Sequence, residues 1–221
     1  MNKWIMAGTA AAFTGAAAFA RSEYERTHLD VVHYDIKTDK LGLEWNGFKA
    51  VFLSDLHDNS FGMENEELIA AIEKEQPDIV LIGGDMLVVK EWAAPHFDML
   101  ANLYEKLVER YPVYYAFGNH EQRMKEEPLT YSGWWQSYWK VLKNSGMHVL
   151  VNKSEEIIKN GGTMRISGIT LPRECYRKGR IPSLSAGYLD QKLGKASDKN
   201  FELLLAHTPT FAKTYADWGA D

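Results

Sequence analysis

The chain has 221 residues, enough for one ordinary α/β domain with a sizeable hydrophobic core. Its formal net charge of −5 offers no basic face to a nucleic-acid backbone, so we expect no obligate nucleic-acid partner, although a phosphodiester substrate is compatible with that charge. The single cysteine, Cys175, excludes a disulfide framework within the chain.

The amino-terminal residues differ in composition from the rest. Lys3 precedes an uncharged, alanine-rich stretch at residues 4–20, and charge resumes at Arg21. This plan, with a small-x-small sequence at Ala18–Ala20, is typical of a secretory signal peptide. The stretch also approaches the length of a membrane helix, about 17–25 residues. We predict that residues 1–27 are a signal peptide or a membrane anchor and that the protein is exported or membrane-anchored. A surface helix packed on a cytoplasmic domain is the alternative.

Residues 28–221 show the alternation of strand and helix patterns that is typical of one α/β domain. An imperfectly alternating run predicts an early strand at residues 29–36, and amphipathic patterns predict helices at residues 64–75, 95–110 and 130–145. Four short apolar runs, each ended by a turn signal, are typical of buried parallel strands. These runs are Ala50–Leu53, Ile79–Ile82, Val113–Phe117 and Leu203–Leu205.

Shorter strands are expected at residues 147–151, 155–158 and 163–168, with a hairpin turn at Asn160–Gly162 between the last two. We expect these three strands to form a second sheet packed on the first. The predicted fold is therefore α/β, with two packed sheets flanked by helices.

Two polar or aromatic segments each have two interpretations. The predicted third helix is rich in tryptophan and tyrosine, which indicates packing on a sheet or, since it begins soon after His120, a wall of a substrate cleft or a lipid contact. The loop after Pro172 is basic, and we interpret it either as a solvated loop or as a contact for phosphate or anionic headgroups. Its basic residues are Arg173, Arg177, Lys178 and Arg180.

Polar side chains follow all four apolar runs, where ligands collect in open α/β sheets. The sequences are Asp55-Leu56-His57, Gly84-Asp85, Gly118-Asn119-His120-Glu121 and Ala206-His207. We expect them at one edge of one sheet. Carboxylate, imidazole and amide groups suit divalent Zn, Mn, Fe or Mg, and six candidates fit two ions that share one carboxylate. Each motif alone is more often a turn or a helix cap, but their joint occurrence predicts a metal site.

This motif set resembles that of the calcineurin-like metallophosphoesterases, whose pattern runs Asp-x-His, Gly-Asp, Gly-Asn-His-Asp/Glu, His and finally Gly-His-x-His. The resemblance implies a four-layer α-β-β-α sandwich and two divalent ions, Mn, Zn or Fe. It implies that Asp55 and His57 bind the first ion, that Asp85 bridges both, and that Asn119 and His207 bind the second.

The same resemblance implies that His120 is catalytic and not a ligand, lying beside the scissile phosphate, where it stabilises charge or protonates the leaving oxygen. It covers about residues 50–221. The final Gly-His-x-His is absent, which leaves three protein ligands for each ion, with Asp85 counted twice. We therefore expect the chain to be a fragment that lacks its last strand or strands.

The implied function is hydrolysis of phosphomonoesters or phosphodiesters through a metal-bound hydroxide. Some membrane-associated members of the family hydrolyse the pyrophosphate of UDP-2,3-diacylglucosamine, so a lipid-linked or cell-envelope substrate is one option. The alternative is a non-catalytic metal-binding or scaffolding remnant, because the last ligand motif is absent. A serine hydrolase is excluded, since no Gly-x-Ser-x-Gly sequence occurs.

Overall fold

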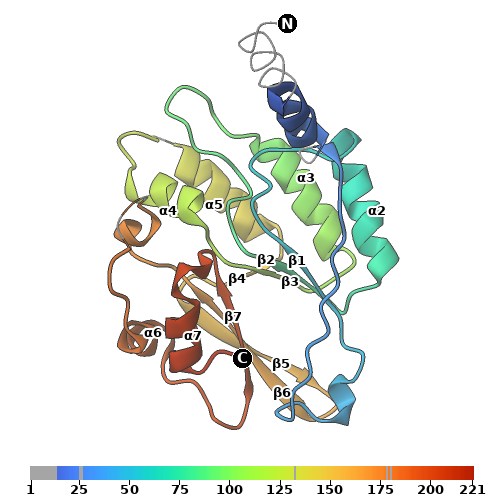
Figure 1. Ribbon diagram of the computed structural model, residues 1–221, viewed down its shortest axis with the longest axis vertical. Helices are drawn as coiled ribbons and strands as arrows, with labels where there is room; N and C mark the ends of the chain where they lie inside the picture. Colours follow the sequence, from blue (N-terminus) through green and yellow to red (C-terminus); the bar gives the residue numbers. More distant parts are fainter. Residues whose placement is uncertain (1–13, 25–26, 132, 178, 180) are drawn as a thin grey trace, which may run out of the picture.

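The structure is a computed structural model that describes residues 14–24, 27–131, 133–177, 179 and 181–221. Residues 14–24 form a largely exposed helix that extends from one end of the molecule (Figure 1). Within the described residues, no helix is both long enough and apolar enough to cross a membrane. Part of the predicted leader at residues 1–27 lies outside the described residues, and its assignment stays a prediction.

The first sheet has four parallel strands in the order β1-β2-β3-β4. They are β1 (Ala50–Leu53), β2 (Ile79–Ile82), β3 (Val113–Tyr115) and β4 (His148–Val149). Every residue of β2 is buried, because a central parallel strand is covered on both faces. The apolar runs therefore predicted the first two strands residue for residue.

Three helices cover one face of this sheet: α2 (Glu66–Glu75), α3 (Phe97–Val108) and α5 (Trp134–Asn144) (Figure 1). In the aromatic helix α5, Tyr138 and Leu142 are fully buried, as the packing interpretation predicts. Trp135 and Trp139 are half-buried and stack with ring centroids 5.4 Å apart.

The second sheet has three strands in the order β5-β6-β7. They are β5 (Lys153–Lys159), β6 (Gly162–Ile169) and β7 (Phe201–Ala206). The β5–β6 hairpin turns through Asn160 and Gly161, which both have positive φ angles, as a two-residue type I′ turn requires. The expected strand at residues 147–151 instead pairs as β4 with β3 in the first sheet, because it follows α5 as one more parallel crossover.

The outer face of the second sheet carries α6 (Ala186–Leu193) and α7 (Ala212–Trp218), and an apolar cluster that includes Ile79, Tyr114, Ile166 and Leu205 fills the space between the sheets. The four layers expected from the family resemblance are therefore present (Figure 1). The remaining elements are α4 (Asn119–Glu126) and the 3-10 helices η1 (Leu43–Trp45), η2 (Met63–Asn65), η3 (Arg173–Tyr176) and η4 (Pro209–Phe211).

The prediction of an early strand at residues 29–36 is wrong. The segment is extended but pairs with no described strand, and the side chains of Val31, Tyr34 and Ile36 are exposed. Val32, Tyr34 and Ile36 alternate onto one face, but no described strand pairs with the segment and that face stays exposed, because alternation alone does not supply a partner. The His33 ring anchors the segment to α2 through a 2.7 Å contact with Glu75.

Candidate metal centre

The centre is built where β1 and β2 end side by side. Because these strands are adjacent and parallel, the loops that follow them continue to pair: Asp55 N–H donates to the Gly84 carbonyl at 3.0 Å, and His57 N–H donates to the Asp85 carbonyl at 3.1 Å. The two loops thus hold their acidic and imidazole side chains at one common rim of the sheet.

The backbone at this rim is strained. Asp55, His57, Asp58 and Asp85 all have φ between 51° and 58°, in the left-handed region that non-glycine residues seldom occupy. Each such residue costs on the order of 1–3 kcal/mol and persists only where the surroundings hold it. Four such residues in two paired loops indicate that this backbone conformation is retained for function and not for stability.

Two glycines allow the ends of β2 and β3 to meet. A Cβ atom on Gly84, whose φ is 93°, would lie 2.0 Å from the Gly118 nitrogen, and a Cβ on Gly118 would lie 2.2 Å from Asp85 Oδ1. Only glycine permits this approach. It brings the carboxylate of Asp85 to the start of α4, where His120 N–H donates to Asp85 Oδ1 at 2.8 Å.

The buried Asp85 is the centre of the cluster. Its Oδ2 lies 3.4 Å from His57 Nε2, 3.2 Å from His207 Nε2 and 3.9 Å from His120 Nε2. The more exposed Asp55 adds its Oδ1 at 3.6 Å from His57 Nε2 and 3.9 Å from His207 Nε2. The structure therefore brings five of the six predicted side chains together.

Asn119, the sixth predicted residue, is half-buried and begins α4 between Gly118 and His120. Its backbone position is set by the same contacts that place Asp85 against this helix. The Asn119 backbone therefore lies at the rim, because its neighbours Gly118 and His120 both contact Asp85 there.

The expectation that one sheet supplies all these residues is wrong. His207 follows β7, which belongs to the second sheet, and its Nδ1 donates to the Gly83 carbonyl at the end of β2, 2.9 Å away. The two sheets pack face to face, so the carboxyl end of β7 meets the carboxyl end of β2. The centre therefore joins the two sheets.

The charges of Asp85 and His207 stabilise each other. Burial would raise the pKa of Asp85, but hydrogen bonds from His207 and from His120 N–H outweigh it and lower that pKa to about 2. Burial would likewise lower the pKa of His207, yet the Asp85 carboxylate raises it to about 9.

The His120 ring is oriented by hydrogen bonds to Nδ1, the nitrogen that faces away from Asp85. Its Nδ1 accepts hydrogen bonds from Val89 N–H at 3.0 Å and from Arg123 Nη2 at 2.9 Å. In the neutral ring, Nε2 therefore carries the proton and faces Asp85. Burial lowers the pKa of His120, which favours this neutral form.

Sequence reasoning assigned no role to Glu121, which the structure places beneath the rim. This fully buried carboxylate accepts from the backbone N–H groups of Asp85, Met86 and Gly118 at 3.0–3.1 Å. It also accepts from the Tyr115 hydroxyl at 2.7 Å. Burial and the Asp85 charge raise the pKa of Glu121 to about 7, although these four donors favour its charged form. A signal for it existed, since an acidic residue at the third position of α4 reaches back to the helix start.

Two further residues shape the rim and were also missed. Ser54 donates to Asp55 Oδ2 at 2.6 Å. Asp58 accepts from Val88 N–H at 2.8 Å and from His96 N–H at 3.2 Å, which ties the loop after β2 to the loop after β1. The two Asp58 contacts could not be inferred from spacing, because they join residues 30 and 38 positions apart.

The donor set fits divalent cations. Asp55, Asp85 and His207 have ligand atoms within 4.8 Å of one another, and so do His57, Asp85 and His120. Asp85 belongs to both groups. Carboxylates with neutral imidazoles suit Zn, Mn or Fe, and the bond from His207 Nδ1 to Gly83 leaves Nε2 as the ligand atom.

A hollow of about 580 Å³ opens beside Asp55 and His57. Its walls include the apolar side chains of Leu29, Leu53 and Phe61. The predicted basic loop does not line this hollow: Arg173 forms an ion pair with Glu127 and Arg177 is exposed, while Lys178 and Arg180 lie outside the described residues. The loop still borders the centre, because the Tyr176 ring lies 6.2 Å from the His207 ring, centroid to centroid.

Comparison with known proteins agrees with this geometry. The family model of the calcineurin-like phosphoesterases matches residues 48–221. An uncharacterized metallophosphoesterase of Bacillus subtilis, YkoQ, is 29% identical over 157 residues, which cover 71% of this chain and 52% of that protein. Phosphodiesterase YaeI of Escherichia coli is 27% identical over 174 residues, which cover 77% of this chain and 56% of that protein.

The chain thus spans about half the length of these curated relatives. Among solved structures, the phosphopantetheinyl hydrolase PptH of Mycobacterium tuberculosis matches 77% of this chain and 61% of that chain, with 17% identity and a TM-score of 0.40. The family match extends over most of the chain, from residue 48 to residue 221. It includes every residue of the metal-candidate cluster, which comprises Asp55, His57, Asp85, Asn119, His120 and His207. The chain belongs to the calcineurin-like phosphoesterase family.

Proposed function

We propose that the protein is a metal-dependent phosphoesterase whose two divalent ions are held by Asp55, His57, Asp85, Asn119 and His207. The observation that carries this proposal is the position of Asp85 Oδ2 between the Nε2 atoms of His57 and His207, at 3.4 and 3.2 Å. A buried carboxylate that faces two imidazoles at once has the placement needed to serve both ions.

The proposed roles of these residues follow from their charge and their orientation. When bound, divalent ions neutralise a phosphate ester and lower the pKa of water so that it attacks at neutral pH. Asp85 supplies the shared negative charge, and the Gly83 carbonyl holds His207 in the tautomer that presents Nε2. The strained loops after β1 and β2 keep these groups in place before substrate arrives.

His120 acts on the substrate as a hydrogen-bond donor in this proposal. Its Nδ1 is occupied by the Val89 N–H and Arg123, so its Nε2–H is available to stabilise charge on the phosphate or to protonate the leaving oxygen. As a metal ligand, His120 would have to move its proton to Nδ1, where it would oppose two donors.

We further propose a phosphodiester or pyrophosphate substrate that carries an apolar group, such as a lipid-linked cell-envelope compound of the UDP-diacylglucosamine type. Two observations support it: the Escherichia coli relative is named a phosphodiesterase, and the hollow beside Asp55 has apolar as well as polar side chains in its walls. Hydrolysis rates on an aryl phosphomonoester, an aryl phosphodiester and a UDP-linked pyrophosphate, measured side by side, test this choice. Faster turnover of the monoester would contradict it.

A membrane-anchored or exported location, through residues 1–27, is part of the same proposal. It rests on the basic start and apolar middle of that segment. A reporter enzyme that is active only outside the cytoplasm, fused after Asp221, should be active when residues 1–27 are present and inactive when they are deleted. Equal activity of both fusions would contradict the proposed location.

Two substitutions separate metal binding from catalysis. Asp85→Asn should lose most bound metal and activity, because it removes the charge that both ions share. His120→Ala should keep its metal and lose a factor on the order of 10²–10⁴ in turnover. Metal analysis beside kinetics on an aryl phosphodiester measures both. If His120→Ala lost metal as fully as Asp85→Asn, the role assigned to His120 would be wrong.

A further inference from the structure

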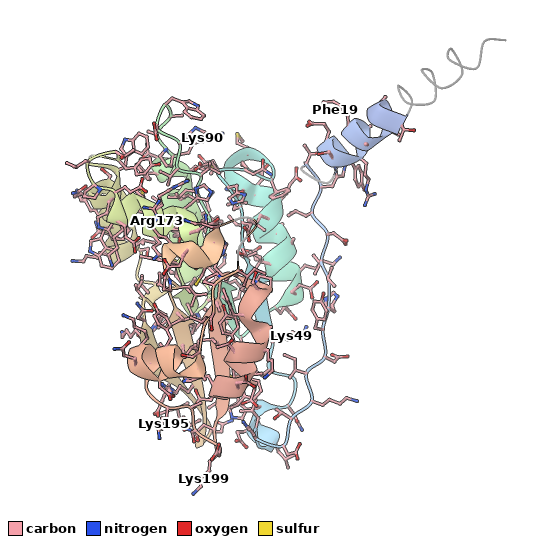
Figure 2. All side chains as sticks on the ribbon, turned by 60° about the vertical axis from the view of Figure 1, so that its left-hand side comes forward. Phe19, Lys49, Lys90, Arg173, Lys195 and Lys199 are labelled. Carbon is pink, nitrogen blue, oxygen red and sulfur yellow. The ribbon has the colours of Figure 1, made fainter. Side chains whose placement is uncertain are left out.

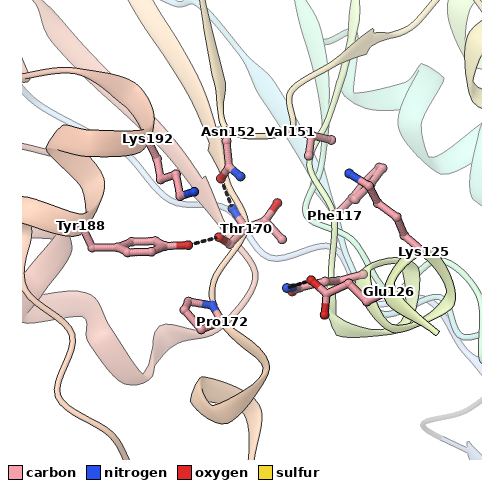
Figure 3. Close-up of a pocket in the computed structure, with 10 residues that line it drawn as sticks. Phe117, Lys125, Glu126, Val151, Asn152, Thr170, Pro172, Tyr188 and Lys192 are labelled. Carbon is pink, nitrogen blue, oxygen red and sulfur yellow. Dashed lines mark hydrogen bonds between the residues drawn. The ribbon is translucent and has the colours of Figure 1, made fainter.

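A second pocket lies between α4, the turn that joins β4 to β5, the end of β6, and α6 (Figure 3). Its volume is about 210 Å³, and none of its lining residues belongs to the metal-candidate cluster. That volume equals about seven water molecules and lies below the range of about 300–1,000 Å³ that is usual for larger ligands. The pocket therefore suits a small ligand.

Two buried polar side chains that line this pocket have an oxygen without a hydrogen-bond partner. Gln122 and Thr170 are only 6% and 8% exposed, and Gln122 Oε1 and Thr170 Oγ1 accept or donate no hydrogen bond among the described residues. An unpaired buried polar group is unfavourable, because it has lost its hydrogen bonds to water without a replacement. A ligand that supplies the missing partners would recover this free energy.

The neighbouring hydrogen bonds define what each group can offer. Gln122 Nε2 donates to Glu126 at 2.8 Å, so its Oε1 is an acceptor that needs a donor. The Thr170 N–H donates to Asn152 Oδ1 at 2.9 Å, and its carbonyl accepts from the Tyr188 hydroxyl at 3.0 Å. The Thr170 hydroxyl is thus left for a ligand, and the Asn152 amide presents its NH₂ as a further donor.

Two lysines carry positive charge at the pocket. Figure 3 shows Lys125 and Lys192 on opposite sides of Thr170. Their ammonium groups lie over aromatic rings, 5.8 Å from the Trp135 centroid and 5.7 Å from the Tyr188 centroid, and neither forms an ion pair within the described part of the chain. Together they exceed the charge of Glu126, which also lines the pocket.

We propose that this pocket binds a phosphate-sized oxyanion. The two ammonium groups, the Thr170 hydroxyl and the Asn152 NH₂ donate to its oxygens. The P–OH group that phosphate keeps near neutral pH donates to Gln122 Oε1. Sulfate has the same size but carries no proton, so it leaves the Gln122 acceptor unpaired and binds less well.

Calorimetric titration of inorganic phosphate into the metal-loaded chain and its Asp85→Asn variant tests the proposal. Asp85→Asn should still bind phosphate, since the pocket is separate from the metal ligands. Lys192→Met, and independently Thr170→Val, should weaken binding about tenfold, the loss expected for one charge-assisted or buried hydrogen bond. Lys199→Met is the matched control, because this exposed lysine lies outside the pocket (Figure 2).

Sulfate should bind more weakly than phosphate, and Gln122→Leu should remove that difference. Glycerol 3-phosphate in a parallel titration distinguishes the free anion from the phosphate group of a larger molecule. The proposal is overturned if phosphate binding disappears in Asp85→Asn, if Lys192→Met binds as tightly as Lys199→Met, or if phosphate shows no saturable binding.

Discussion

His207 and Asp85 form the ion pair on which the electrostatics of the centre depend. Each is almost completely buried, and each shifts the pKa of the other toward the charged form. A metal ion must displace the proton of His207 before it can bind there. We therefore infer that metal binding releases a proton and becomes stronger as pH rises toward about 9.

In the metal-free chain, this ion pair should make the free energy of unfolding depend on pH. The pKa of His207 is about 9 in the folded chain, above the ordinary 6.5, so its contribution is complete below pH 6.5 and is lost as pH rises through 9. The folded pKa of Asp85, about 2, lies below 3.8, so its contribution is lost as pH falls below 3.8.

Melting temperatures in chelator from pH 6 to pH 9 test this prediction. Wild type should lose on the order of 2 kcal/mol relative to His207→Gln across that window. His148→Gln, at an exposed histidine paired with Glu155 on the far end of the sheet, is the control. Parallel pH profiles for wild type and His207→Gln would contradict the ion pair.

At the scale of elements, α4 is the part that holds the centre together. Its first residues carry Asn119 and His120, and Glu121 ties the helix to the loop after β2. A chain of buried hydroxyls continues from it: Tyr115 donates to Glu121 at 2.7 Å, and Tyr138 and Tyr104 follow at 2.7 and 2.8 Å. Glu121 is thereby fixed from α3 and α5 as well as from the rim.

Glu121→Gln should weaken both the fold and the metal centre. The amide replaces one acceptor oxygen by a donor that faces backbone N–H groups, which should cost about 1–3 kcal/mol and lower metal affinity by about 10–100-fold. Tyr138→Phe is the matched control, because it removes a hydroxyl from the chain and leaves the four donors to Glu121 intact; its cost should be near 1 kcal/mol. Thermal melting and metal titration measure these effects. Equal metal affinity in the two variants would contradict the role of Glu121.

At the scale of the whole molecule, the metal-candidate cluster joins the two sheets. Asp55, His57 and Asp85 extend from the first sheet, whereas His207 extends from the second. A bound ion would therefore link layers that are otherwise held by the apolar cluster between them.

Removal of metal should lower the melting temperature. At a metal concentration of 100 times its Kd, binding stabilises by about 2.7 kcal/mol, which corresponds to roughly 5–10 °C for a domain of this size. Melting curves with manganese and with chelator should differ by that amount in wild type. Asp85→Asn should show little difference. A shift of equal size in Asp85→Asn would indicate that the ion binds elsewhere.

The local sequence was sufficient to predict those elements whose conformation depends on neighbouring residues. The runs at Ala50–Leu53 and Ile79–Ile82 form strands as predicted. Ile79–Ile82 is buried on both faces, as a near-continuous apolar run in a parallel sheet requires, whereas Ala50–Leu53 is the edge strand and leaves Phe52 exposed. The Asn160–Gly161 hairpin likewise follows from residues that accept positive φ. The motif residues after these strands were identifiable for the same reason, since strand ends in an open sheet meet at one edge.

Contacts between segments that are distant in the sequence were decided only by the tertiary structure. It placed β7, and hence His207, in the second sheet, moved residues 147–151 into the first, and left residues 29–36 outside both sheets that the described residues form. It also gave Glu121 its four donors from two separate stretches of chain, residues 85–86 and 115–118. Hydrophobic periodicity records which face of an element is buried but not which neighbour buries it, because that choice depends on the packing of the whole core.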